Sequence, residues 1–190
     1  MGNFYVNYTL RGPSQMAVAE ALSGHSAIVT PSHLGCVVAF DETSEMQDER
    51  TIMRLALQLS LELHCPVLAV LNHDDDILCY WLYINGRLID QYNSAPDYFD
   101  ESADDSNPVG GDAEKLCRAF SAGDAAVIEA ILRKPSGDKD GYLFAIDRHV
   151  DLAKALDIPT YGVGFGYTYV ERGELPENLQ ESDLIIVKKT

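Results

Sequence analysis

Apolar residues recur along the chain with the periods that mark helices and strands. Over 52–63, Ile, Leu and Ala stand three and four positions apart, which predicts a helix with one buried side. The continuous apolar run 77–84 has the length of a strand that is buried on both faces. Asn85-Gly86 separates this run from 87–92 and predicts a tight β-hairpin, because both residues tolerate positive φ.

The order of elements in the first half of the chain indicates an α+β fold. Aromatic and β-branched residues predict strands, and stretches rich in Ala and Leu between Pro or Gly residues predict helices. The expected order is strand 3–10, helix 15–22, strand 26–30, strand 36–40, helix 45–63 and strand 67–71. This order is typical of a ferredoxin-like βαββαβ unit. We therefore predict such a unit over residues 1–95, extended by the hairpin.

The second half of the chain predicts a smaller, mainly helical unit that ends in a strand. An acidic loop or linker over 96–112 contains Pro and Gly and has no apolar period. Over 113–190, helices are expected near 113–120, 124–132 and 144–156, and a last strand near 184–187. Because so short a unit buries little surface alone, we expect it to pack on the first unit.

Alternation over 161–170 predicts one more strand, with an aromatic face. The residues of that face are Tyr161, Val163, Phe165, Tyr167 and Tyr169, and glycines occupy positions 162, 164 and 166 between them. Strictly alternating glycines do not match the dinucleotide motif G-x-G-x-x-G, but they would leave one sheet face open to close approach. The aromatic face is expected in the core or on a binding surface.

Charge and hydropathy restrict the class of protein. With 14 Lys and Arg against 30 Asp and Glu, the formal net charge is -16, which disfavours binding to nucleic acid or to an anionic membrane. No apolar run approaches the roughly 20 residues of a membrane-spanning helix, and the first residues lack the apolar centre of a signal peptide. We therefore expect a cytoplasmic protein whose four cysteines are buried free thiols.

The predicted linker has the strongest local charge. It contains Asp97, Asp100, Glu101, Asp104 and Asp105, and no basic residue occurs over 97–112. Such a run is either a solvated loop or a surface that attracts a basic partner. The leading hypothesis is a non-enzymatic interaction protein of the inhibitor or immunity type, which binds a basic protein. The absence of G-x-S-x-G, H-E-x-x-H and P-loop motifs agrees with a role without catalysis.

The alternative hypothesis is a small-molecule-binding protein or an enzyme. Its pocket would lie between the two predicted units, with an aromatic lining. The candidate residues are Tyr161, Phe165, Tyr167 and Tyr169, facing Trp81 or Tyr83. Rings of this kind supply apolar contact area, and the tyrosine hydroxyls supply hydrogen bonds.

One turn carries residue types that bind metal ions. His73 is followed by Asp74, Asp75 and Asp76 between two apolar strands. Their nitrogen and oxygen atoms suit a divalent cation, but consecutive residues in a turn point in different directions. The same residues fit a polar turn whose carboxylates accept local backbone hydrogen bonds. We predict a polar turn here, and neither a metal nor another cofactor.

Overall fold

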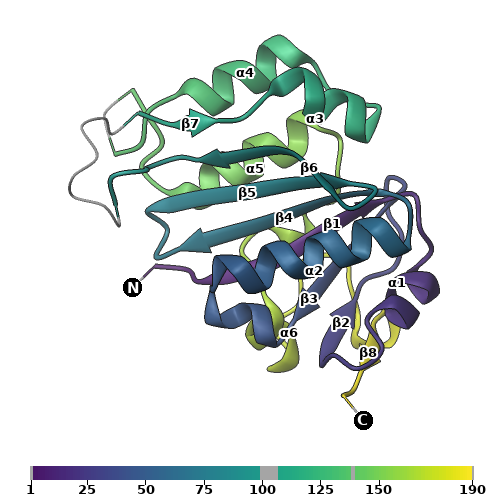
Figure 1. Cartoon of the computed structure of the whole chain (residues 1–190). Coiled ribbons are helices and arrows are strands. Elements are labelled where there is room, and N and C mark those ends of the chain that lie inside the picture. Colours follow the sequence, from purple (N-terminus) through teal and green to yellow (C-terminus); the bar gives the residue numbers. More distant parts are fainter. Residues whose placement is uncertain (1, 99–106, 138–139, 190) are drawn as a thin grey trace.

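The computed structural model describes residues 2–98, 107–137 and 140–189, which form a mixed α/β structure around one antiparallel sheet (Figure 1). The strand order in these residues is β7-β6-β5-β4-β1-β3-β2-β8. The strands are β1 Tyr5–Arg11, β2 Ala27–Val29, β3 Cys36–Asp41, β4 Pro66–His73, β5 Ile77–Ile84, β6 Arg87–Asn93, β7 Val109–Gly110 and β8 Ile185–Val187. The α-helices are α1 Gln15–Ala21, α2 Glu49–Glu62, α3 Ala113–Phe120, α4 Ala125–Arg133, α5 Ala145–Ala155 and α6 Tyr167–Glu171, and the short 3-10 helices are η1 Thr43–Met46, η2 Thr160–Gly162 and η3 Glu181–Asp183. None of the described helices is long and apolar enough to cross a membrane.

The helix and the hairpin that the apolar pattern predicts in the first half are confirmed. Helix α2 begins after Asp48, whose carboxylate accepts a hydrogen bond from Thr51 N at 2.9 Å. Its buried apolar residues are Ile52, Leu55, Ala56 and Leu59. Asn85 and Gly86 join β5 to β6 with φ values of 50° and 72°, the left-handed conformation that the tight turn requires.

Helices α1 and α2 cover one face of the sheet, which we call the α1/α2 face (Figure 1). Val6, Tyr8 and Leu10 of β1 point into this face and pack with apolar residues of both helices and of strands β2 to β5. Trp81 and Tyr83 of β5 belong to the same cluster. Since successive side chains of a strand point to opposite faces, the residues between these positions face the other side of the sheet.

The second half of the chain covers the opposite side, which we call the C-terminal face. Helices α3, α4 and α5 pack against β4, β5 and β6, and α6 packs against β2 and β3. Polar side chains tie these elements together within the apolar contacts. The Tyr92 hydroxyl donates to Leu132 O at 2.9 Å, and the fully buried Arg148 donates to Ile131 O at 2.7 Å.

The strand predicted over 161–170 is wrong, because this segment contains η2 and α6 instead. The reason lies in β1, where Asn7 Nδ2 donates to Gly162 O at 2.6 Å and to Phe165 O at 3.1 Å. Two carbonyl groups that a strand would offer to its neighbour are therefore used by one side chain. Gly164 has φ +79°, which breaks the extended conformation between them.

The glycines of this segment allow close packing rather than strand pairing. A Cβ at position 166 would press on the Glu45 carboxylate and lie 3.0 Å from Tyr5 Cβ, so any other residue would displace the Glu45 side chain. The Glu45 carboxylate then accepts hydrogen bonds from Tyr167 N at 3.1 Å and Thr168 N at 3.4 Å, at the beginning of α6. The alternating glycines of this segment therefore belong to a turn that packs on the sheet, and not to a strand.

The remaining elements of the second half agree with the sequence. The helices expected near 113–120, 124–132 and 144–156 are confirmed as α3, α4 and α5, and the last strand is confirmed as β8. Strand β8 pairs with β2, and β7 pairs with β6 within the segment predicted as a linker. Most of the acidic run lies outside the described residues.

Candidate functional site

Four segments meet at the end of the sheet where β4 passes into β5. Gln47, just before α2, places its Oε1 2.6 Å from Nδ1 of His73 at the end of β4. Beyond β6, the ring of Tyr98 lies 5.9 Å from the His73 ring, measured between centroids. Ala145, the first residue of α5, donates from its backbone N to Asp75 O at 2.6 Å. This end of the sheet is on the left of Figure 1.

Carboxylates from all four segments gather there. We call this surface the acidic end, and it consists of Asp48, Glu49, Asp74, Asp75, Asp76, Asp97 and Asp147. Four of these residues are exposed, and Asp74, Asp75 and Asp97 are half-buried. In the described part of the chain, the ion pairs of Lys and Arg with carboxylates all lie elsewhere, on α3 and α4. The negative charge of the acidic end is therefore not neutralised by such pairs.

The turn residues considered as metal ligands accept hydrogen bonds from the backbone near the beginning of the chain. Asp74 Oδ1 accepts from Gly2 N at 2.9 Å, and Asp75 Oδ2 accepts from Asn3 N at 3.2 Å. Asp74 and Asp75 have φ values of 55° and 61°, as in a tight turn. Within residues 2–98, 107–137 and 140–189, no three His, Cys, Asp or Glu side chains are arranged to hold a metal ion. Asp74 and Asp75 thus form a polar turn, but their carboxylates bind the backbone of a distant segment and not the local backbone groups that the sequence predicts.

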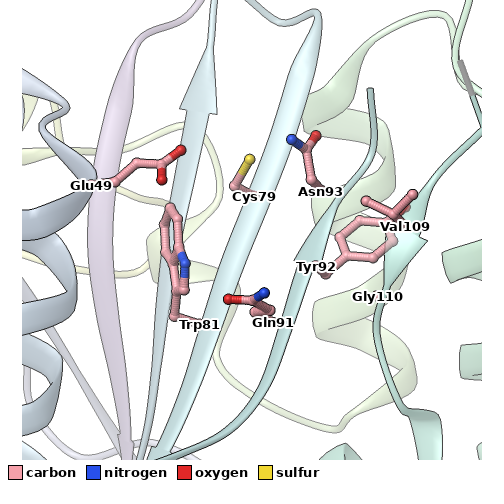
Figure 2. Close-up of a pocket in the computed structure, with 8 residues that line it drawn as sticks. All are labelled: Glu49, Cys79, Trp81, Gln91, Tyr92, Asn93, Val109 and Gly110. Atoms are coloured by element: carbon pink, nitrogen blue, oxygen red, sulfur yellow. The ribbon is translucent and has the colours of Figure 1, made fainter. Parts of the chain in front are cut away.

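A groove of about 380 Å³ opens beside the acidic end on the α1/α2 face (Figure 2). It is lined by Glu49, Cys79, Trp81, Gln91, Tyr92, Asn93, Val109 and Gly110. The register of β5 and β6 pairs Cys79 with Asn93 and Trp81 with Gln91, so these four side chains share one face. Figure 2 shows the Glu49 carboxylate above the indole of Trp81, with the two carboxamides on the β6 side.

The groove combines an apolar floor with a polar rim. Trp81 is 5% exposed, whereas Val109 at the edge is 46% exposed. Burial raises the pKa of Cys79 to about 12, and the charge of Glu49 adds to this effect, so the thiol stays protonated and is a poor nucleophile. A carboxylate, two carboxamides and an indole together suit a Lys or Arg side chain, whose methylene groups pack on apolar surface while its charge contacts the carboxylate.

The structure does not bring together the aromatic residues that the sequence assigns to one pocket. Trp81 and Tyr83 lie on the α1/α2 face. The other candidates lie on the C-terminal face: Tyr161, Phe165, Tyr167 and Tyr169. Tyr167 is buried there, and its hydroxyl donates to Glu171 Oε1 at 3.2 Å.

Two of these residues do line a cavity. Tyr161 and Phe165 contribute to a space of about 720 Å³ on the C-terminal face. The ring of His33, from the turn between β2 and β3, lies 5.5 Å from the Tyr161 ring, and Lys154 of α5 adds a positive charge to the lining. Among the described residues, Tyr167 and Tyr169 are not part of this lining.

Of the five acidic candidates in the predicted linker, Asp97 alone lies among the described residues. Asp97 belongs to the acidic end. The other four lie outside the described residues: Asp100, Glu101, Asp104 and Asp105. The described chain leaves this segment at Tyr98 and resumes at Asn107, just before β7, which contributes Val109 to the groove.

Sequence reasoning missed the polar residues of the groove. Gln91 and Asn93 stand two apart in β6, so the hairpin register could have placed them opposite Trp81 and Cys79. Nothing in the sequence indicates that Glu49 joins them, since this depends on how α2 packs across the sheet. Comparisons of the chain with protein-family models, with curated proteins and with solved structures give no match.

Proposed function

We propose that this chain is a non-enzymatic interaction protein of the inhibitor or immunity type, which binds a basic segment of another protein at the acidic end. The observation that carries the proposal is the convergence of carboxylates from four segments beside a groove suited to a cationic side chain. The formal net charge of -16 acts in the same direction.

The groove and the acidic end have separate roles in this binding. One Lys or Arg of the partner enters the groove, packs against Trp81 and pairs with Glu49. Exposed carboxylates such as Asp76 attract the flanking cations and accelerate the encounter. Because the screening length falls from about 10 Å at 0.1 M salt to about 3 Å at 1 M, binding weakens with salt.

The test begins with capture of partners from a lysate of the source organism at low and high salt, followed by affinity measurements on the purified partner. The variant Glu49→Gln with Asp76→Asn removes two negative charges from the site. We expect it to weaken binding roughly five- to tenfold, mainly through lost charge pairing. The matched control is the double variant Glu174→Gln with Glu181→Gln, which removes two exposed charges outside the acidic end. Salt-independent binding, or equal weakening by the control variant, would contradict the proposal.

A second candidate function is the binding of a small molecule in the cavity that contains Tyr161 and Phe165. Its volume of about 720 Å³ is within the range of ligand sites. Lys154 can pair with an anionic group of the ligand, and Asp157 and Glu177 of the same lining can accept hydrogen bonds from its donor groups. A thermal-shift screen of aromatic carboxylates tests this candidate. Stabilisation that is lost in Tyr161→Ala supports it, and stabilisation that persists in this variant places the ligand elsewhere.

We further infer that β1 to β4 with α1 and α2 form a ferredoxin-like unit and that the protein works in the cytoplasm. The antiparallel order β4-β1-β3-β2, with both helices on one face, supports the fold assignment. Four free cysteines support a reducing compartment.

A further inference from the structure

A cavity of about 360 Å³ lies between α2, the start of β2 and the end of β3, and it shares no lining residue with the groove. Its lining includes His25 and Asp41, and it also includes Arg54 of α2 and Lys189 beyond β8. The lining thus brings two of the 14 Lys and Arg residues of a strongly acidic chain together with a histidine and with two carboxylates, Asp41 and Glu42.

Asp41 is the buried centre of a hydrogen-bond network beneath this cavity. Its side chain is 1% exposed, and its Oδ2 accepts from Ser44 N at 2.9 Å and from Ser44 Oγ at 2.7 Å. The Tyr8 hydroxyl lies 2.7 Å from the same Ser44 Oγ. Because Ser44 gives its hydroxyl proton to Asp41, Tyr8 donates to Ser44. Oδ1 of Asp41 lies 2.8 Å from His25 Nδ1.

This network fixes the orientation of the His25 ring. An ionised carboxylate only accepts hydrogen bonds, so Nδ1 of His25 carries a proton and donates to Asp41. Nε2, on the other side of the ring, makes no hydrogen bond with the described residues and is the nitrogen available to the cavity. Oδ2 of Asp41 binds Ser44 at the beginning of η1, whereas Oδ1 binds only His25 among the described residues. The second oxygen therefore orients a half-buried ring at the cavity.

We propose that this cavity is a binding site for a small anionic ligand that carries a phosphate or carboxylate group. His25 Nε2, Arg54 and Lys189 contact the anionic group. The Glu42 carboxylate and the Gln58 carboxamide also line the cavity and favour a ligand that carries hydroxyl groups as well. The other polar lining residues are Ser26, Thr43 and Thr51. The volume is in the range of small-molecule sites, and the buried Asp41 holds the histidine in place before the ligand arrives.

The test is a titration of the full chain, monitored through the NMR signals of the histidine imidazoles. Glycerol 3-phosphate, citrate and inorganic phosphate are the anionic probes, and glycerol is the neutral probe. We expect His25 signals of the Nδ1-protonated ring, and saturable shifts of these signals with at least one anionic probe and none with glycerol. Arg54→Gln should weaken binding roughly tenfold, since it removes a charged hydrogen-bond donor. Arg118→Gln removes the same charge from exposed α3 and should leave the affinity unchanged.

His25→Gln provides a second variant, because the Gln carboxamide can still donate a hydrogen bond to Asp41 while the imidazole ring is removed. We expect it to abolish the saturable binding of the anionic probe while the thermal unfolding midpoint stays close to that of the parent. Failure of all three anionic probes to saturate at up to about 20 mM would overturn the proposal, since so weak a site has a binding free energy near 2 kcal/mol. Equal weakening by Arg54→Gln and Arg118→Gln would overturn it as well.

Discussion

Strand β1 contributes different kinds of interaction to the two faces of the sheet. On the α1/α2 face, β1 contributes apolar side chains such as Val6 and Leu10 to a continuous cluster. On the C-terminal face, the alternate residues make directional bonds: Asn7 holds two loop carbonyls, and the Tyr5 hydroxyl lies 2.8 Å from His149 Nδ1. Burial of apolar area tolerates a change of shape, whereas a buried donor cannot be replaced by an apolar group without leaving its acceptors unpaired.

Substitutions that preserve volume should separate the two faces most strongly. Arg148 is fully buried, and it donates to Ile131 O, Pro135 O and Ser136 Oγ at 2.7, 3.2 and 3.1 Å. Arg148→Met removes the donor of all three bonds, although Pro135 O keeps its hydrogen bond from Tyr142 N. We expect the free energy of unfolding to fall by about 3 kcal/mol. Leu59→Met, in the apolar cluster of the other face, should cost less than about 1.5 kcal/mol.

Urea unfolding of both variants measures this difference. Equal losses would mean that the bonds of Arg148 contribute no more than its packing. The guanidinium also lies over the Tyr142 ring, 4.5 Å from its centroid. Tyr142→Phe is a useful third variant, because it keeps this ring and the bonds of Arg148 and removes only the hydroxyl that donates to Asp151 Oδ2 at 2.8 Å.

Acid should weaken the C-terminal face in particular. Burial lowers the pKa of His149 to about 4, while the unfolded chain titrates near 6.5. Between pH 6.5 and pH 4 the unfolded chain binds a proton at His149 that the folded chain does not bind. The part of the unfolding free energy that depends on a neutral His149 is therefore fully present above pH 6.5 and is lost as the pH falls towards 4. We expect a loss on the order of 3 kcal/mol that levels off below pH 4.

The measurement compares the unfolding free energies at pH 7 and pH 4.5 for the parent chain and His149→Gln. The variant should lose less stability than the parent over this interval, because the other titrating groups are the same in both. Identical losses would show that His149 is not the group responsible.

Removing the Asn7 side chain should loosen one loop rather than the whole sheet. Asn7→Ala deletes the donors to Gly162 O and Phe165 O, and we expect a loss of about 2 kcal/mol. Amide exchange over 160–166 should accelerate, while exchange in α2 should change far less. Uniform acceleration through both regions would contradict this local role. Val6→Ala is the control on the opposite side of β1.

Thiol reactivity gives the smallest effect, since it does not change stability. Burial raises the pKa of Cys65 to about 11 and of Cys79 to about 12, and both lie on the α1/α2 face. Cys117 on α3 is only half-buried. We expect iodoacetamide to modify Cys117 first and Cys79 last, as followed by peptide mass spectrometry. Rapid modification of Cys79 in the folded protein would show that the groove opens more widely than its geometry indicates.

The sequence predicts what depends on local pattern and misses what depends on distant side chains. Helix α2 and the β5–β6 hairpin follow from apolar spacing and from Asn85-Gly86, since each needs only its own residues and one buried face. The segment 161–170 alternates as a strand would, but the residue that determines its conformation, Asn7, stands 155 positions before Gly162.

The same limit applies to the candidate site. Asp97 and Trp81 are recognisable by charge and by residue type, and the structure places Asp97 at the acidic end and Trp81 in the groove. The role of Glu49 was not recognisable, because acidic residues are plentiful and only the packing of α2 selects this one. The bond between His25 and Asp41 likewise joins two turns whose proximity follows from the pairing of β2 with β3.

The short outer strands have a consequence for self-association. An open sheet edge is a template onto which a strand of another molecule can add, and long apolar strands such as β4 and β5 would be prone to this. The sheet instead ends in β7, with two residues, and β8, with three residues followed by Lys188 and Lys189. The β8 edge therefore offers few free backbone groups and carries repelling positive charges, so this side of the sheet is protected against the addition of a strand from another molecule.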